Sequence, residues 1–220
     1  MSYILLNTSR VHPWTSSLVE WFRVNGRKLP WRNDSNAYKV LVTEKLLQQT
    51  SFGHVLKIYE LFFIKYPSID KLASSNITDI EKEIKQLGFQ KQRATHLKKM
   101  AETIVMDYKS VIPNDRILLI NLYGVGNYIA DAVLCYAFNE KVIPVDVNIR
   151  RIAKRLFRLD SKLKYNEIQE KMSFLLDLNL DIKQLNWALL DFSNIICSRK
   201  PKCKNCFAQN SCNYYLVNYK

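Results

Sequence analysis

Apolar residues along this chain recur mostly three or four positions apart, which is the spacing of one face of an α-helix. In the segment Ile77–Leu87 the apolar positions 77, 80, 84 and 87 follow this rule, and Gly88 comes directly after it. The same period predicts further helices over Tyr38–Thr50, Val55–Tyr66, Arg93–Tyr108 and Leu185–Ile196. Strand-like alternation of apolar and polar residues is nearly absent. The pattern therefore predicts an all-α protein of about ten helices joined by short loops.

The charge balance favours a polyanionic partner. The chain has 220 residues, with 33 Lys and Arg against 20 Asp and Glu, which gives a formal net charge of +13. No apolar run approaches the roughly 18 residues of a membrane span, and the N-terminus lacks the layout of a signal peptide. An anionic membrane surface is the weaker partner, because the basic residues are scattered rather than gathered on one amphipathic helix. We therefore expect a cytoplasmic protein that does not bind membranes.

Four of the five cysteines fall within 16 residues near the C-terminus: Cys197, Cys203, Cys206 and Cys212. Intracellular chains rarely form disulfides, so this cluster predicts a metal site. Four thiolates can hold either zinc or a [4Fe–4S] cluster, and the gaps of five, two and five residues do not choose between them. Cys135 stands apart in an apolar segment and is most simply a small buried residue.

Two of the five glycines lie two positions apart between two apolar helical segments. The first segment ends at Leu122, the second runs from Tyr128 to Phe138, and Gly124 and Gly126 lie between them. Glycine allows positive φ angles and a close approach of the backbone to a ligand. The first N–H groups of the second helix have no partner within the helix and carry the positive end of its dipole. A plain turn would explain two glycines, but in a basic chain this setting also predicts a contact to a DNA phosphate.

Asp146 follows the apolar residue Val145 and precedes another helical segment. Such an aspartate is usually an N-cap, and capping alone would explain it. Capping is compatible with catalysis, because the helix dipole lowers the pKa of a carboxyl group at a helix start and keeps it ionised. An ionised carboxylate is what a positively charged, oxocarbenium-like transition state at a sugar requires.

Together these motifs carry a family resemblance. The segment Leu122–Gly126, the pair Val145-Asp146 and the four terminal cysteines resemble the helix-hairpin-helix DNA glycosylases in order and approximate spacing. This family includes endonuclease III, MutY and the mismatch glycosylases that act on G·T and G·U pairs, and the likeness extends from about Leu29 to Cys212. It implies two helical lobes with a helix-hairpin-helix motif and a C-terminal iron–sulfur cluster loop. It also implies a base-excision repair enzyme that flips one base out of duplex DNA and hydrolyses its bond to the sugar.

The resemblance assigns three catalytic positions. Asp146 matches the essential carboxylate. Glu44 matches a glutamate that acts as acid or base at the flipped base and its attacking water, and a solvated helical glutamate is the alternative. Tyr128 stands where endonuclease III has the lysine that forms a Schiff base, and a partly buried aromatic residue is the alternative. Because tyrosine cannot form that imine, we expect a monofunctional glycosylase with little or no AP-lyase activity.

Other positions match the family's contacts to DNA and its cofactor. Some of these residues would fill the space left by the flipped base, and others would bind phosphates; solvated loops are the alternative. The intercalating residues are Gln48, Gln49, Phe89 and Gln90. The phosphate contacts are Gly124, Val125, Gly126 and Asn127 in the hairpin and Arg199 and Lys200 in the cysteine loop. The four cysteines match the ligands of a structural [4Fe–4S] cluster. Their first gap has five residues where the family usually has six, which affects the expected shape of the loop.

Thymine or uracil opposite guanine is the leading substrate. The chain ends eight residues after Cys212, without the C-terminal domain by which MutY reads 8-oxoguanine, and Val147 and the run Thr50–Tyr59 are more similar to the mismatch enzymes. The glutamine pair at 48 and 49 is the MutY form, so adenine opposite 8-oxoguanine or guanine is the alternative. A non-catalytic iron–sulfur DNA-binding protein is the alternative of another class, and it would not need Asp146.

We expect one lobe over residues 30–138, with the hairpin, and a second over residues 1–29 and 139–220, with the cluster loop at 197–212. Asp146 would then lie near the junction of the lobes, where clefts usually form. The expected partner is double-stranded DNA with a mismatched or damaged base, bound by a monomer in the cytoplasm, at the nucleoid. A downstream AP endonuclease is implied, because the abasic product must be processed.

Overall fold

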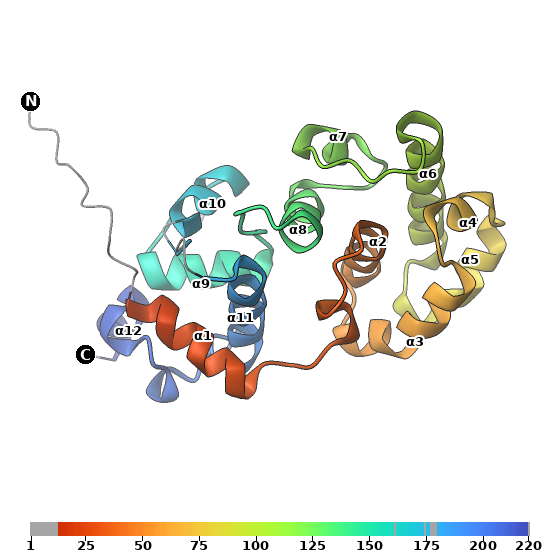
Figure 1. Cartoon of the computed structure of the whole chain (residues 1–220). Coiled ribbons are helices and arrows are strands. Elements are labelled where there is room, and N and C mark those ends of the chain that lie inside the picture. The colour runs from red at the N-terminus through yellow and green to blue at the C-terminus, as the bar shows by residue number, and fades with distance from the viewer. Residues whose placement is uncertain (1–12, 161, 174, 177–179, 220) are drawn as a thin grey trace, which may run out of the picture. The chain divides into compact units, whose positions relative to one another are not determined.

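The computed structural model describes residues 13–160, 162–173, 175–176 and 180–219 (Figure 1). In these ranges the chain forms twelve α-helices and no strand, so the predicted all-α class is confirmed. The helices are α1 (Pro13–Asn25), α2 (Ala37–Leu47), α3 (Phe52–Lys65), α4 (Ile69–Ser74), α5 (Ile77–Glu83), α6 (Gln90–Tyr108), α7 (Arg116–Asn121), α8 (Asn127–Phe138), α9 (Val147–Phe157), α10 (Tyr165–Ser173), α11 (Ile182–Ile195) and α12 (Asn213–Asn218). None of these helices has the length and apolar character needed to cross a membrane.

The chain divides into two compact units, with boundaries after Arg27 and after Pro144. Residues 28–144 contain α2 to α8 and are called the hairpin unit below. The described residues before and after this range contain α1 and α9 to α12 and are called the cysteine unit. The sequence placed the second boundary after Phe138, where α8 ends. In the structure Asn139 ends that helix in the left-handed conformation that asparagine tolerates, and the non-helical residues 139–144 stay with the hairpin unit.

The hairpin unit is built around α2 and α6. Helix α2 packs against α8, α3 and α6, and α4 and α5 lie along α6 (Figure 1). The apolar faces that the sequence pattern predicted meet in this core, which includes the fully buried side chains Leu41, Leu46, Phe62, Leu72, Ile80, Leu97, Ile104 and Val133. Each such side chain stabilises the fold by about 1.5–3 kcal/mol relative to an exposed position.

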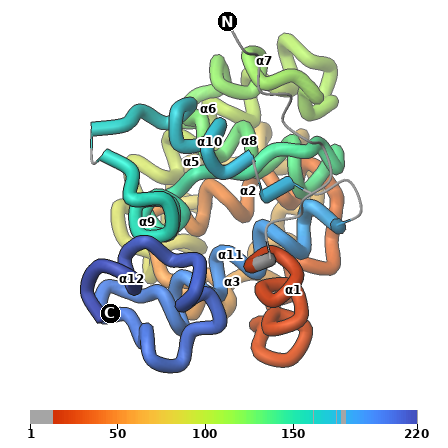
Figure 2. Tube along the Cα trace, turned by 90° about the vertical axis from the view of Figure 1, so that its left-hand side faces the viewer, coloured from red at the N-terminus to blue at the C-terminus, as the bar shows by residue number. Residues whose placement is uncertain are grey.

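The cysteine unit joins its terminal loop to helices through aromatic rings. Helix α1 packs against α11, and α9 packs against α11 and α12, as Figure 2 shows. Phe207 lies in the cysteine loop, with its ring centroid 5.1 Å from that of Phe192 in α11 and 6.2 Å from that of Trp14 in α1. Trp14 and Phe192 are themselves in edge contact at 5.6 Å. This cluster fixes the middle of the loop to the helical core.

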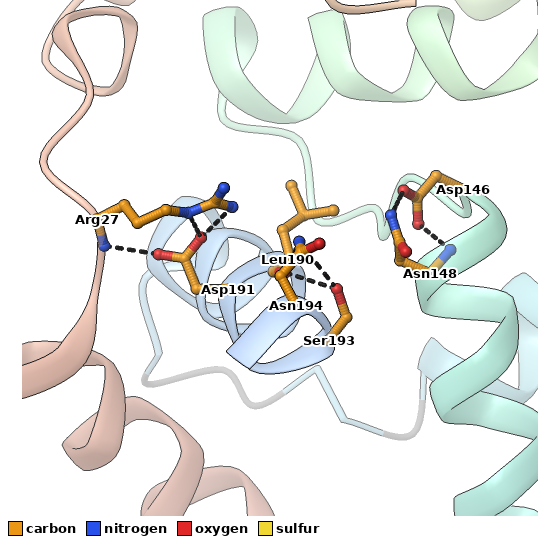
Figure 3. Close-up of polar contacts among 7 residues, drawn as sticks. All are labelled: Arg27, Asp146, Asn148, Leu190, Asp191, Ser193 and Asn194. Carbon is orange, nitrogen blue, oxygen red and sulfur yellow. Dashed lines mark hydrogen bonds and ion pairs between the residues drawn. The ribbon is translucent and has the colours of Figure 1, made fainter. Parts of the chain in front are cut away.

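A buried ion pair ties the end of the first segment to α11. The Asp191 side chain is fully buried and accepts hydrogen bonds from the backbone N and the Nε of Arg27, both at 2.7 Å (Figure 3). We expect Asp191→Ala to lower the free energy of unfolding by about 3 kcal/mol in urea denaturation, because it removes one partner of a buried pair. Glu83→Ala breaks the partly exposed Lys65–Glu83 pair and should cost less than about 1 kcal/mol. Equal losses of unfolding free energy in the two variants would contradict a stabilising role for the buried Arg27–Asp191 pair.

Candidate DNA-binding and catalytic site

The glycine motif forms a tight turn between α7 and α8. Gly124 has φ +72°, in the region that favours glycine, and the backbone N–H of Val125 donates to the carbonyl of Leu122 at 3.0 Å. Gly126 is the N-cap residue of α8, and both Gly126 and Asn127 are exposed while Val125 is buried. The turn therefore presents the first N–H groups of α8 at the surface, as an anion contact requires.

Side chains from three helices hold this hairpin in place. Arg116 of α7 donates to the buried carboxylate of Asp131 in α8 at 2.6 Å and to Asn127 Oδ1 at 3.0 Å. Tyr123 packs its ring against two residues of α6. The ring of His96 lies 5.2 Å from it edge-on, and Lys99 Nζ lies 4.7 Å from its centroid. A turn braced in this way would need little reorganisation to bind an anion.

The predicted intercalating glutamines lie in a turn and not in a helix. The expected helix Tyr38–Thr50 ends at Leu47, and Gln49 takes a positive φ of 55°. The reason is a tertiary contact: the buried guanidinium of Arg93 in α6 donates to the carbonyl oxygens of Lys45 at 2.7 Å, Leu46 at 3.2 Å and Gln48 at 2.9 Å. These bonds satisfy the last carbonyls of α2 and leave both glutamine side chains exposed.

The second predicted loop is joined to the first. Gly88 and Phe89 have positive φ angles of 74° and 49°, and the Phe89 side chain is 65% exposed. Gln90 begins α6 and is half-buried. Thr50 Oγ1 donates to the carbonyl of Leu87 at 2.8 Å. One pocket results, lined by Lys45, Gln48, Gln49, Phe89, Gln92, Arg93 and His96.

Lys45 is a residue that sequence reasoning missed. It is only 1% exposed, and its Nζ donates to the carbonyl of Gly124 at 2.7 Å and to Gln48 Oε1 at 3.0 Å. Burial and the nearby charge of Arg93 lower the pKa of Lys45 to about 8, so that it is mainly the ammonium at neutral pH. Burial and the neighbouring cations also lower the pKa of His96, which is therefore mainly neutral.

Asp146 caps α9, as its position predicted. Its Oδ1 accepts from the backbone N–H groups of Asn148 at 2.9 Å and Ile149 at 2.7 Å, and its Oδ2 accepts from Asn148 Nδ2 at 2.7 Å (Figure 3). The expected lowering of its pKa is wrong in direction. Burial raises the pKa of this half-buried carboxyl and outweighs the lowering by these hydrogen bonds and by the charge of Arg151.

Glu44 and Tyr128, the other two predicted catalytic residues, belong to the hairpin unit. Glu44 lies on α2 and is 7% exposed, so the alternative of a solvated helical glutamate is wrong. Tyr128 is half-buried in the first turn of α8. Asp146 belongs to the cysteine unit, so the joint action of the three residues stays a prediction.

The four clustered cysteines converge on one hollow of the cysteine unit. Its wall is mostly apolar and includes Trp14, Ile152, Leu156, Phe192 and all four cysteines. Burial raises the pKa values of Cys197, Cys203 and Cys206, that of Cys206 to about 11. The backbone N–H of Ala208 lies 3.4 Å from Cys206 Sγ. Among the described residues, no three His, Cys, Asp or Glu groups are arranged to hold a metal ion, so the predicted metal site is not shown.

Helix α9 connects this loop to Asp146. Arg155 donates to the carbonyl of Ser198 at 2.6 Å and contacts Cys197 Sγ at 3.4 Å. Arg151 donates to the carbonyl of Cys197 at 2.9 Å and to Asn148 Oδ1 at 3.0 Å, and Asn148 in turn holds Asp146. A continuous chain of hydrogen bonds therefore connects the loop with the Asp146 carboxylate. Arg199 and Lys200 are exposed in the same loop.

The all-α fold with its helix-hairpin-helix turn is that of a class of helical DNA-binding proteins. A solved thermostable thymine-DNA glycosylase has a similar fold, with a TM-score of 0.87. The two sequences are 37% identical, and the match covers 92% of this chain and 95% of that one. The chain belongs to the HhH-GPD superfamily of base excision DNA repair proteins, whose family model matches residues 42–176. A thymine/uracil-DNA glycosylase of Methanothermobacter thermautotrophicus is 37% identical over 92% of this chain and 93% of its own length. A thymine-DNA glycosylase of Aeropyrum pernix is 35% identical over 96% and 98%.

Proposed function

We propose that this protein is a monofunctional DNA glycosylase that removes thymine or uracil opposite guanine in duplex DNA. Membership of a base-excision repair family makes it a DNA glycosylase, a hydrolase of N-glycosyl bonds. The observation that carries the finer assignment is the similarity over nine-tenths or more of both chains to proteins named for thymine and uracil. We place it in the cytoplasm, at the nucleoid, where such a substrate would be.

DNA binding would begin at the hairpin. The N–H groups at the start of α8, around the exposed residues Gly126 and Asn127, would donate hydrogen bonds to a phosphate without reading sequence. Arg199 and Lys200, exposed in the cysteine loop, would contact further phosphates, in keeping with the net charge of +13. Gln48, Gln49, Phe89 and Gln90 would then fill the space left by the flipped base and offset part of the lost stacking.

Two carboxyl groups would have separate roles in cleavage of the bond. As the bond between C1′ of the sugar and the base nitrogen breaks, the Asp146 carboxylate would stabilise the positive charge that develops on the sugar. Glu44 would move the proton between water and base, so that the water oxygen ends on C1′ and a proton on the departing base. Tyr128 carries no amine, so an imine with the sugar cannot form there. The product would be an abasic site, which an AP endonuclease must process.

We infer that the four cysteines hold a [4Fe–4S] cluster, as the resemblance implies. All four line one mostly apolar hollow, and four thiolates are the ligand set that such a cluster takes. The N–H group of Ala208 directed at Cys206 Sγ is a typical stabilising contact of a cluster thiolate. A bound cluster would supply a rigid link between the four positions of the loop, and the catalytic steps are assigned to side chains elsewhere.

Duplexes that contain G·T, G·U, G·A or 8-oxoguanine·A test the substrate. We expect the protein to bind each duplex as a monomer. It should release thymine and uracil but not adenine, measured as strand cleavage after alkali. Cleavage should not appear without alkali, and borohydride should trap no protein–DNA adduct, because Tyr128 cannot form an imine. Release of adenine alone would favour the adenine-specific alternative. Binding without release of any base would favour the non-catalytic one.

A further inference from the structure

The buried ammonium of Lys45 has no role in the chemistry just described. Removing a charge from water is costly, so a fully buried lysine persists where its hydrogen bonds hold something in place. Lys45 has two such bonds, and neither partner is a carboxylate: they are the carbonyl of Gly124 and the side-chain amide of Gln48. It thus connects the hairpin turn with a predicted intercalating residue.

The contact leaves little freedom on the hairpin side. A Cβ atom at Gly124 would lie 2.9 Å from Lys45 Nζ and 2.8 Å from His96 Nδ1, so the ammonium is packed directly beneath the turn. The titratable groups around it come from α6: the cation Arg93 and the mainly neutral ring of His96, with Lys99 Nζ over the ring of Tyr123. Arg93 in turn fixes the backbone of Gln48 by its hydrogen bond to that carbonyl at 2.9 Å. Both ends of the Lys45 contact are therefore anchored.

An ammonium group can only donate hydrogen bonds, and this decides which way the Gln48 amide faces. Its oxygen must face Lys45, so the NH2 group is the end left for DNA. A glutamine held in this way presents its NH2 group as a hydrogen-bond donor, and a flip that exchanged its oxygen and its NH2 group would lose the bond to Lys45. At position 6 of a purine, guanine presents an oxygen acceptor, whereas adenine presents an amino donor.

We propose that Lys45 is a positioning residue that fixes the Gln48 amide as a donor toward a 6-oxopurine, guanine or inosine, opposite the excised base. The inference rests on the proposed function, because it assigns to Gln48 the recognition of the base left behind. It makes Lys45 a determinant of opposite-base preference without contact to the DNA.

The test compares rates of uracil release under single-turnover conditions from duplexes with uracil opposite guanine, opposite inosine and opposite an abasic analogue. The ratio of the guanine rate to the abasic rate measures the contact to the opposite base and cancels effects on the chemistry. We expect Lys45→Met to lower this ratio about three- to tenfold, the size of one hydrogen bond, and to lower the inosine ratio equally. Lys98→Met is the control, because Lys98 is a half-buried lysine that likewise donates to a backbone carbonyl, that of Ala73, and the ratio in this variant should not change.

Two further variants separate positioning from packing. In a Gln48→Ala background, Lys45→Met should lower the ratio no further, because the amide through which it acts is gone. Gln48→Glu leaves the buried site intact but has no donor, and its ratio should fall as far as that of Gln48→Ala. An unchanged ratio in Lys45→Met or in Gln48→Glu, or a second fall in the Gln48→Ala background, would overturn the proposal. If the wild-type protein releases no uracil from any duplex, the proposed function fails first and this inference falls with it.

Discussion

Replacing Asp146 by asparagine should abolish most base release while leaving the fold intact. Asparagine is as good an N-cap as aspartate, so the bonds from the N–H groups of Asn148 and Ile149 can persist. What disappears is the negative charge that would face the sugar. Loss of one preorganised electrostatic group costs on the order of 10²–10³ in rate, and we expect a fall in that range in single-turnover release of thymine or uracil opposite guanine. Salt-dependent DNA binding should be retained.

Asp181 provides the matched control for this substitution. It caps α11 in the same unit and accepts from the backbone N–H groups two and three residues ahead, as Asp146 does. Asp181→Asn should therefore release bases at the wild-type rate. If Asp146→Asn also did so, the catalytic role of Asp146 would be wrong and it would be a capping residue only.

The pH dependence of base release is a second test of the role of Asp146. Burial raises the pKa of the Asp146 carboxyl, so protonation should begin at a higher pH than for a solvated aspartate. In the proposed mechanism the active form is the carboxylate. Wild-type base release should therefore decline as the pH falls toward that raised pKa, and the residual activity of Asp146→Asn should lack this decline.

The parts of the site that could be predicted from sequence are those that local chemistry determines. Gly124 supplies the positive φ angle of the turn, and Asp146 caps the helix that follows it directly. The core faces follow from a period of three to four residues. None of these features depends on which distant segment lies nearby.

What could not be predicted depends on contacts between distant residues. Arg93 donates a hydrogen bond to the carbonyl of Gln48, 45 positions away, at the end of α2. The two glutamines therefore lie outside the helix that the sequence predicted. Lys45 meets Gly124 across 79 positions, and its only local sign is a charged residue on the otherwise apolar face that includes Leu41. The direction of the Asp146 pKa shift was also missed, because burial is a property of the whole fold.

Replacing Cys206 by serine should remove the proposed [4Fe–4S] cluster and weaken the cysteine unit. The purified wild-type protein should contain iron and sulfide and show iron–sulfur absorbance in the visible range, and Cys206→Ser should lose most of each, because serine is a poor cluster ligand. Each kcal/mol of lost stability lowers Tm by about 2–4 °C in a chain of this size, and the loss of a four-point link should lower it by on the order of 10 °C.

Cys135→Ser is the control that separates this effect from the loss of any buried thiol. Cys135 is fully buried in α8 of the hairpin unit, so the variant should keep the iron and its absorbance. The link from Cys197 through Arg151 and Asn148 to Asp146 adds a consequence for catalysis. Loosening the loop in Cys206→Ser should slow base release as well, whereas Cys135→Ser should leave its rate at the wild-type level. Full iron content in Cys206→Ser, or zinc in place of iron in the wild-type protein, would show that these cysteines do not hold the cluster.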